Sequence, residues 1–334
     1  MPFTLQIKTK LITSTRYNPY ENLALEEYLL NNVQDGEVIL YLWQNENTIV
    51  IGKNQNPWKE CRVSLVEKDG VRIARRLSGG GAVFHDLGNL NFTFIMKEAL
   101  YDLDKQLETI ISATQSLGIN AAFTGKNDIT VDGKKFSGNA FYFSDEGSYH
   151  HGTILVKTDL SALGNYLQVS KEKMMSKGID SVKSRVVNLA DLNPDITISK
   201  MSQALVKSFE TIYKNSVEVM AFPGEKALQE KTEKNASWEW RFSQTPKFDV
   251  KFEKRFDFGS LEFLFSLKDS KIQKVEIYSD AVLTGVLETI KKLLVGVRFN
   301  AQEMGQRLDA ADHNTGEEKK MITQIKQWIR TKEL

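Results

Sequence analysis

The chain has 334 residues, of which 41% are hydrophobic and 26% are charged, and its 44 basic and 43 acidic side chains give a net charge of +1. This length predicts about two domains, and the balanced charge argues against a general nucleic-acid binder. No stretch reaches the roughly 18 apolar residues of a membrane span. The N-terminus lacks the pattern of a secretion signal, so the sequence predicts a cytoplasmic protein that does not enter a membrane.

The first predicted elements are a helix and a set of strands. Asn18-Pro19-Tyr20-Glu21 combines a capping side chain, a proline at the first helical position and a glutamate three residues after the cap, which predicts a helix over about 19–33. Strand-like runs of apolar and β-branched residues follow. They cover residues 38–44, 48–52, 71–76, 82–86 and 90–96. This part of the chain is therefore predicted to form a sheet built largely from hairpins.

The predicted sheet continues after a helix over about 101–117. Four further strand-like runs cover residues 120–124, 127–133, 134–143 and 150–158. Residues 170–185 are polar and basic and are typical of a short helix with a loop, whereas 199–214 has helical periodicity.

The chain turns polar between about 223 and 246, and we predict the domain boundary there, which divides the chain into residues 1–246 and 247–334. Strand-like runs follow over 247–258, 260–268 and 271–279, and the remainder is predicted to form two or three helices. The second domain is therefore a small α+β unit.

The most distinctive stretch is RRLSGGGAVFHDLGN, residues 75–89. Three glycines allow backbone N–H groups to converge on a phosphate or carboxylate, although a hairpin turn would also need glycine for its geometry. Arg75 and Arg76 leave a strand on opposite faces, so at least one of them is predicted to meet an anion. His85 is either a general base or a hydrogen-bonded structural residue. The stretch matches neither the P-loop nor the dinucleotide-binding fingerprint.

RRLSGGGAVFHDLGNLNFTF resembles the lipoate-binding signature of lipoate-protein ligases. The resemblance extends over nearly the whole chain, through residues 56–61, 125–141, 150–156 and 181–189. It implies an α+β fold, with a mixed-sheet catalytic domain like that of biotin-protein ligases followed by a small C-terminal α+β domain. It also implies the substrates ATP and free lipoic acid, the cofactor Mg²⁺, and as acceptors the lipoyl domains of 2-oxoacid dehydrogenase E2 subunits and the glycine cleavage H protein.

The resemblance also selects site residues. Asp132-Gly133 is a strong hairpin-turn pair, so Lys134 and Lys135 begin a strand and point to opposite faces. The family match selects Lys135 as the catalytic residue, where one ammonium would bridge the lipoate carboxylate and the α-phosphate. Two solvated lysines are the alternative. Asp128 is the implied Mg²⁺ ligand, or else it caps a turn.

The ligand-binding residues implied by the resemblance include the glycine stretch and a mobile loop that closes over the adenylate, where Lys183 or Arg185 lies near phosphate. Trp43 matches a position near the lipoyl tail, although a strand tryptophan is also typical of a core. Adjacent histidines on a strand face opposite sides, which argues against a zinc site at residues 150–151. The implied binding residues are Trp43, Arg76, Ser78, Gly79, Gly80, Gly81, Ala82, Val83, Phe84, His85, Asn89, Asn127, His151, Lys183 and Arg185.

One departure from the family pattern and one cysteine bear on the reaction. Some members carry arginine where this chain has Tyr142. The same fold serves ATP-dependent ligation and acyl transfer through a cysteine thioester, but Cys61 is the only cysteine, and none follows Lys135. Ligation is therefore predicted. An octanoyl or lipoyl acyltransferase and a noncatalytic regulator that binds the lipoyl adenylate are the alternatives, and biotin ligation is the nearest enzymatic rival.

Overall fold

The structure, a computed structural model, describes residues 7–124, 128–167, 186–242, 250–268, 271–311 and 315–332. The chain divides into two compact units. The N-terminal unit comprises Met1–Ile51, Pro57–Arg76 and Ala82–Arg241, and the C-terminal unit comprises Gly52–Asn56, Leu77–Gly81 and Phe242–Leu334. The domain boundary predicted between residues 246 and 247 lies outside the described residues, and the glycine stretch is divided between the two units.

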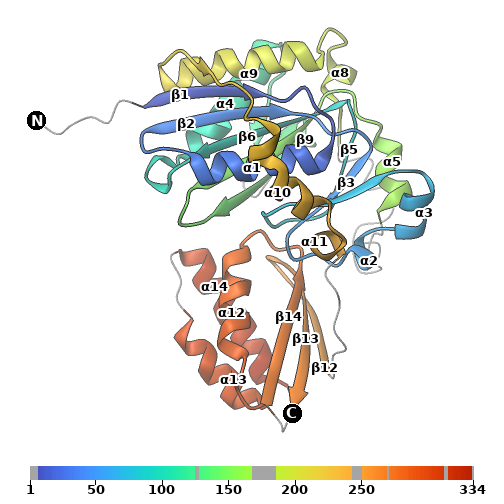
Figure 1. Cartoon of the computed structure of the whole chain (residues 1–334), viewed down its shortest axis with the longest axis vertical. Coiled ribbons are helices and arrows are strands. Elements are labelled where there is room, and N and C mark those ends of the chain that lie inside the picture. Colours follow the sequence, from blue (N-terminus) through green and yellow to red (C-terminus); the bar gives the residue numbers. More distant parts are fainter. Residues whose placement is uncertain are drawn as a thin grey trace, which may run out of the picture. The chain divides into compact units, whose positions relative to one another are not determined.

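The N-terminal unit is built on an eight-stranded mixed sheet with the order β11-β1-β2-β6-β10-β9-β8-β7 (Figure 1). β1 pairs with β2 and β11 in parallel, and the other described pairs are antiparallel. The strands are β1 (Lys8–Thr13), β2 (Glu37–Trp43), β6 (Asn89–Met96), β7 (Ala122–Phe123), β8 (Asp128–Val131), β9 (Lys134–Phe143), β10 (Ser148–Leu155) and β11 (Glu218–Val219).

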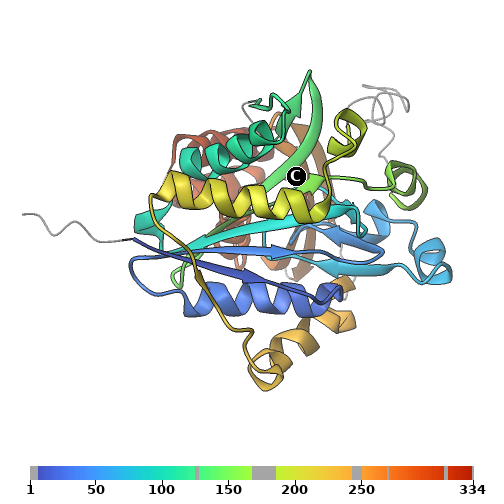
Figure 2. The same cartoon turned by 90° about the horizontal axis from the view of Figure 1, so that it is seen from above.

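Helices cover both faces of this sheet (Figure 2). α4 (Leu103–Ser116) and α9 (Ile198–Tyr213) lie on one face, and α1 (Pro19–Asn32) and α10 (Glu225–Ala236) lie on the other. The apolar core fills the α4–α9 side, where Phe92 and Phe94 of β6 are fully buried. Since side chains alternate along a strand, the intervening Asn91 and Thr93 point toward α1. The sheet therefore presents a polar face to α1.

Short elements complete the N-terminal unit. A second sheet has the order β4-β3-β5 and consists of β3 (Thr48–Ile51), β4 (Arg72–Arg75) and β5 (Val83–His85). The short helices are α2 (Pro57–Glu60), α3 (Val63–Lys68), η1 (Glu98–Leu100), α5 (Leu160–Tyr166), α8 (Leu189–Leu192) and α11 (Trp238–Phe242).

The helix predicted at 19–33 is confirmed as α1. Asn18 caps it, since its side chain accepts a hydrogen bond from the Tyr20 N–H, and Pro19 occupies the first position. The buried face of α1 is partly polar. Asn22 and Glu26, one turn apart, are 1% and 2% exposed. Because buried polar groups need partners, their hydrogen bonds fix how α1 lies on the sheet.

The prediction of a sheet built largely from hairpins is wrong around the glycine stretch. β3 pairs with β4 in parallel and with β5 antiparallel, so β4 and β5 flank β3 and do not pair with each other. The connection between them therefore crosses the end of β3 and is not a hairpin turn. A Cβ atom on Gly52 would lie only 2.4 Å from the carbonyl oxygen of Gly80. This close backbone approach is the physical reason for a glycine directly after β3.

The polar segment 223–246 was predicted as the region of the domain boundary, but most of its described part is helical. α10 packs against α1 and buries Leu228 and Asn235, two turns apart. Its other positions are mainly glutamate and lysine, which are good helix formers with little apolar signal. β1 was also not predicted. In both cases the local sequence carries a weak pattern and packing against a neighbour decides the structure.

The C-terminal unit is a small α+β unit, as predicted (Figure 1). Its antiparallel sheet has the order β12-β13-β14, and its core joins Phe263 and Phe265 of the sheet to Leu287 and Trp328 of the helices. Among the described residues, no helix has the length and apolar character needed to cross a membrane. The elements are β12 (Val250–Phe256), β13 (Gly259–Lys268), β14 (Lys271–Ser279), α12 (Thr284–Leu294), α13 (Ala301–Arg307), η2 (Leu308–Ala310) and α14 (Gly316–Arg330).

Candidate functional site

A row of residues crosses the α1 face of the large sheet. The strand pairing places Trp43 opposite Asn91, Asn91 opposite Thr153, Thr153 opposite Gly138, and Gly138 opposite Asp128. Residues directly opposite each other on neighbouring strands point to the same face. The register thus brings Trp43 and Asp128, predicted from distant parts of the sequence, onto one face of one sheet.

Lys135 lies at one end of this row. Asp132 and Gly133 both have positive φ, at 49° and 75°, so the predicted two-residue hairpin turn is confirmed. The Lys135 Nζ lies 2.7 Å from Asp128 Oδ1, and the two side chains are 35% and 44% exposed. A Cβ on Gly138 would lie 2.8 Å from this Nζ, so the lysine side chain extends over the glycine. The sheet therefore holds one accessible ammonium group next to one accessible carboxylate.

A buried network occupies the same face deeper in the unit. His151 donates from Nδ1 to Glu26 Oε1 at 2.8 Å, and Thr93 Oγ1 donates to the same oxygen at 2.8 Å. Trp43 Nε1 in turn donates to Thr93 Oγ1 at 3.1 Å. Because a carboxylate only accepts hydrogen bonds, the contact with Glu26 requires a proton on Nδ1 of His151. The network joins α1, β2, β6 and β10.

The two histidines predicted to face opposite sides do so. His150 points into the core, where its ring nitrogens lie 3.0 Å from Gln106 Oε1 and 2.8 Å from Asn139 Oδ1. His151 points toward Glu26 on the other face. Among the described residues, no group of three or more His, Cys, Asp or Glu side chains is arranged to hold a metal ion.

Arg76 and His85 are buried basic residues of the same unit. Burial lowers the pKa of Arg76 to about 10, an effect that Tyr149 and Glu26 partly oppose. Burial, together with Arg76 and His151, lowers the pKa of His85 to about 3. His85 is therefore neutral at pH 7 and is unsuited to act as a general base.

The tautomer of His85 follows from its neighbour. Asn45 donates from Nδ2 to His85 Nδ1 at 3.2 Å, so the ring proton lies on Nε2. Among the described residues, no group accepts a hydrogen bond from this Nε2, although His85 is only 3% exposed. The His85 ring also meets Trp43 edge to face, with 6.2 Å between centroids. A buried donor without an acceptor is a suitable contact for a ligand oxygen.

Arg75 has a different role from Arg76. Its Nε donates to the carbonyl of Trp240 and one terminal nitrogen donates to the carbonyl of Arg241, both at 2.8 Å. Trp240 Nε1 returns a hydrogen bond to the Arg75 carbonyl at 2.9 Å. Arg75 thus stabilises the end of α11, where backbone carbonyls lack helical partners.

The residues Leu77–Gly81 of the glycine stretch form part of the C-terminal unit, where Gly80 N–H donates to the carbonyl of Ala281 at 3.1 Å. A Cβ on Gly79 would lie 2.4 Å from the same Ala281 oxygen, and Gly80 has a φ of +89°. A Cβ on Gly81 would meet nothing within 4 Å. Packing explains Gly79, the backbone conformation explains Gly80, and neither explains Gly81.

The other predicted residues have varied surroundings. Ser78 is fully buried, and its carbonyl accepts from Lys53 N–H at 2.9 Å. Phe84 stacks on Tyr166 of α5, with 5.9 Å between ring centroids, so it points to the opposite side of β5 from His85. Asn89 donates to Asn91 Oδ1 at 3.0 Å. Ala82 and Val83 are half-buried.

Three predicted residues, Asn127, Lys183 and Arg185, lie outside the described residues. The described chain resumes at Val186, which bridges to Lys135 in parallel, and Val187 N–H donates to the Lys135 carbonyl at 2.9 Å.

Several polar residues of this face were not predicted from the sequence. For Asn91 and Thr93 a signal existed, because they alternate with aromatic residues in LNFTFIM. For Glu26 the sequence contains no such signal, because a buried glutamate on a helix cannot be told from an exposed one until the packing of α1 on the sheet is known. The residues missed are Glu26, Asn45, Asn91, Thr93, Tyr149 and Thr153.

Two remaining sequence arguments concern Cys61 and Tyr142. Cys61 is 1% exposed, and burial raises the pKa of its thiol to about 12, with Glu60 adding to the shift. This thiol is a poor nucleophile, because the thiolate is the reactive form. Tyr142 stacks on Tyr149 with 5.4 Å between ring centroids.

Comparison with known protein families identifies both units. Residues 18–210 match the lipoyl protein ligase A/B catalytic domain, and residues 245–329 match the bacterial lipoate protein ligase C-terminus. The chain belongs to the lipoate-protein ligase family. The lipoate-protein ligase A of Psychrobacter cryohalolentis is 36% identical over 97% of this chain and 98% of its own length, and that of Bdellovibrio bacteriovorus is 36% identical over 96% and 98%.

Solved structures of lipoate-protein ligases have the same fold. The structure of P. falciparum LipL1 in complex with lipoate is 30% identical, covers 97% of this chain and all of its own, and has a TM-score of 0.86. A lipoate-protein ligase A bound with ATP is 25% identical, covers 72% of this chain and all of its own, and has a TM-score of 0.62. The predicted α+β fold and the predicted family are confirmed.

Proposed function

We propose that this chain is an ATP-dependent, AMP-forming lipoate-protein ligase that joins free lipoate to a specific lysine of lipoyl domains, those of E2 subunits and the glycine cleavage H protein. Family membership over both units supports this proposal. The observation that carries it is the Lys135–Asp128 pair, which lies on the same sheet face as the buried network of Trp43, Glu26 and His151.

The first half-reaction forms lipoyl-AMP. The lipoate carboxylate attacks the α-phosphate of ATP, and pyrophosphate leaves. An ammonium group that contacts both anions would bring them together and offset the negative charge that accumulates in the transition state. Lys135 is the candidate, because its ammonium is accessible and the end of its side chain lies over Gly138. Asp128 is the candidate to hold Mg²⁺ against the nucleotide, a role that needs one or two carboxylates together with substrate phosphates.

The second half-reaction transfers the lipoyl group. The amine of the acceptor lysine attacks the mixed anhydride, an amide forms and AMP leaves. A lysine with a pKa of about 10.4 is almost entirely protonated at pH 7, so the amine must lose a proton before it attacks. Burial lowers the pKa of His85 to about 3, which argues against His85 as the base in this step.

The binding residues have separate proposed roles. Trp43, Arg76, His85 and His151 would contact the lipoyl tail and carboxyl region, since they are buried in the N-terminal unit. The glycine stretch, with Lys183 or Arg185, would hold phosphate. The ATP-bound lipoate-protein ligase A and the archaeal bi-partite ligase with its E2 lipoyl domain, which is 28% identical with a TM-score of 0.65, support these ligand classes. The predicted cytoplasmic location stays a prediction.

The test is a single-turnover measurement of lipoyl-AMP with Lys135→Ala. We expect the rate to fall by about a hundred- to a thousandfold, the usual effect of losing one such donor. Release of pyrophosphate should require both ATP and lipoate. A wild-type rate in Lys135→Ala would remove this lysine from the mechanism, and nucleotide-free transfer from an acylated carrier protein would replace ligation with acyl transfer.

A further inference from the structure

The C-terminal unit contains a hollow of about 630 Å³ that none of the roles above uses. The first residue of β14, the turn before α13 and α13 itself line it. Its lining residues are Lys271, Gly296, Val297, Arg298, Glu303, Gln306 and Arg307. Ser279 ends β14 and Lys271 begins it, so the hollow lies at the far end of this strand, about 26 Å from the segment that meets the glycine stretch.

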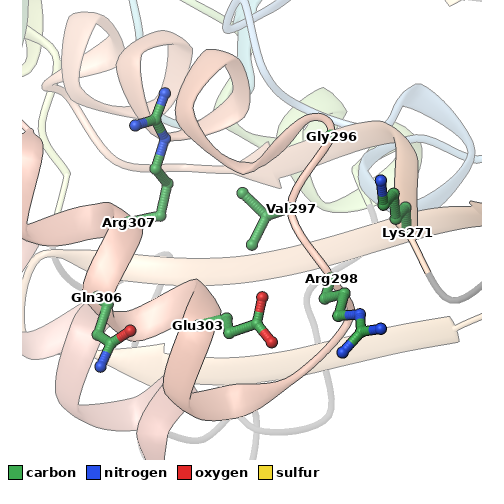
Figure 3. Close-up of a pocket in the computed structure, with 7 residues that line it drawn as sticks. All are labelled: Lys271, Gly296, Val297, Arg298, Glu303, Gln306 and Arg307. Atoms are coloured by element: carbon green, nitrogen blue, oxygen red, sulfur yellow. The ribbon is translucent and has the colours of Figure 1, made fainter.

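The hollow carries a local excess of positive charge. Three of its lining side chains are cations and one, Glu303, is an anion, in a chain whose net charge is only +1. Figure 3 shows Arg307 on one side of Val297 and Lys271 on the other, with Arg298 below Lys271. All three cations are exposed, so a partner can reach them from solvent.

These cations differ from others in the same unit. Among the described residues, no carboxylate forms an ion pair with Lys271, Arg298 or Arg307. Seven other cations of the unit pair with a glutamate or aspartate. They are Lys251, Arg255, Lys274, Lys291, Lys320, Lys326 and Arg330. Within the part of the chain that the structure describes, the charges around the hollow are therefore not neutralised by carboxylates of the fold.

We propose that this basic hollow is a docking site for an acidic surface of the acceptor protein. The two guanidinium groups can each donate a pair of parallel hydrogen bonds to a carboxylate, and the ammonium of Lys271 can donate single hydrogen bonds. The identity of the partner as the acceptor rests on the proposed function, which requires a second protein to approach the chain.

The expected binding affinities favour a protein surface over a small anion or a nucleic acid as the partner of the hollow. An exposed ion pair improves affinity only about two- to fivefold, so a single small anion in an open hollow is held weakly. Several pairs on one rigid surface act together and also accelerate encounter. Nucleic-acid binders typically neutralise about six to ten phosphates, more than three cations can contact.

The experiment titrates the full-length chain with an unmodified, negatively charged lipoyl domain carrying a fluorescent label, and measures Kd by anisotropy at low and moderate salt. The double variant Arg298→Glu/Arg307→Glu should raise Kd about tenfold or more and flatten its salt dependence. It should raise the KM for the domain in the transfer step by a similar factor while the rate of lipoyl-AMP formation stays unchanged.

The matched control is Lys292→Glu/Lys319→Glu, which changes the net charge equally. Both lysines are exposed residues of the same unit and neither lines the hollow. The control should change Kd less than twofold. Arg298→Gln/Arg307→Gln, checked by its thermal midpoint, separates lost contacts from any misfolding caused by charge reversal.

Three results would overturn the docking site: no binding by the wild-type chain, equal effects of the two charge-reversal variants, or stronger binding of a single-stranded RNA oligonucleotide through the same arginines. Failure of the proposed function looks different. In that case the wild-type chain would bind the domain through the hollow but form no lipoyl-AMP.

Discussion

Replacing Gly138 with alanine is expected to move the ammonium of Lys135 without unfolding the sheet. The new Cβ would stand 2.8 Å from Nζ and 2.9 Å from Cε, whereas ordinary contacts begin near 3.4 Å. The lysine end must therefore shift by roughly 0.6–1 Å. Gly138 has no positive φ, and its N–H, which alanine retains, donates to Thr153 Oγ1. The fold should accept the substitution because only the flexible end of a side chain has to move.

A shift of about 1 Å in a positioning group can cost about a hundredfold in rate. We therefore expect Gly138→Ala to slow single-turnover formation of lipoyl-AMP by about 10- to 100-fold, with a thermal midpoint close to that of the wild type. The control is the double variant Gly138→Ala/Lys135→Ala. If the alanine acts through Lys135, the double variant should be no slower than Lys135→Ala alone. Additive losses, or a wild-type rate for Gly138→Ala, would refute the reasoning.

Three further predictions follow from burial and packing. Gly79→Ala should lower the free energy of unfolding in urea by about 1–3 kcal/mol, because its Cβ would lie 2.4 Å from a carbonyl oxygen. Gly81→Ala should change that free energy by less than about 0.5 kcal/mol but raise the KM for lipoate or ATP. Equal stabilities of the two variants would contradict this. The native thiol of Cys61, with a pKa of about 12, should resist iodoacetamide at pH 8, and Cys61→Ser should retain ligation; rapid alkylation or an inactive folded variant would argue for a thiol mechanism. Burial lowers the pKa of His85 and of His150 to about 3, so below pH 6.5 the unfolded chain binds protons that the native chain does not. The free energy of unfolding should therefore fall between pH 6.5 and 3 by up to about 1.4 kcal/mol per pH unit for each histidine. A urea midpoint that stays constant over that range would contradict this prediction.

The parts of the fold that could be predicted are those with strong local chemistry. The cap and proline of α1 fix its start within a few residues, and the Asp132–Gly133 turn aligns β8 with β9. These signals are local because the residues that determine the conformation are neighbours in the chain.

The parts that could not be predicted depend on contacts between distant segments. The arrangement of β4 and β5 on either side of β3 places Gly52 under the carbonyl of Gly80, and no local pattern encodes that crossing. α10 has a polar sequence and is held by α1, so its composition resembles that of a linker.

Some residues of the candidate site could likewise be predicted from the sequence, and others could be found only from the packing of distant segments. The resemblance to lipoate-protein ligases supplied Lys135 and His151, whose side chains the structure places on the α1 face of the sheet. Glu26 was missed, because a glutamate on a helix is normally exposed and only the packing of α1 buries this one. A general-base role for His85 was left open by the sequence, and it is burial that argues against it.

The polar underside of α1 has a consequence for ligand binding. Asn22 and Glu26 together form hydrogen bonds with Ser14, which follows β1, with Thr93 of β6 and with His151 of β10. If the helix were rotated by one residue, both side chains would lose these hydrogen bonds while remaining buried. The hydrogen bonds therefore fix the rotation of α1 about its own axis. If this face of the sheet binds substrate, as proposed, α1 is already ordered before substrate arrives, and the entropy cost of ordering it is part of folding and is not repeated in each catalytic cycle.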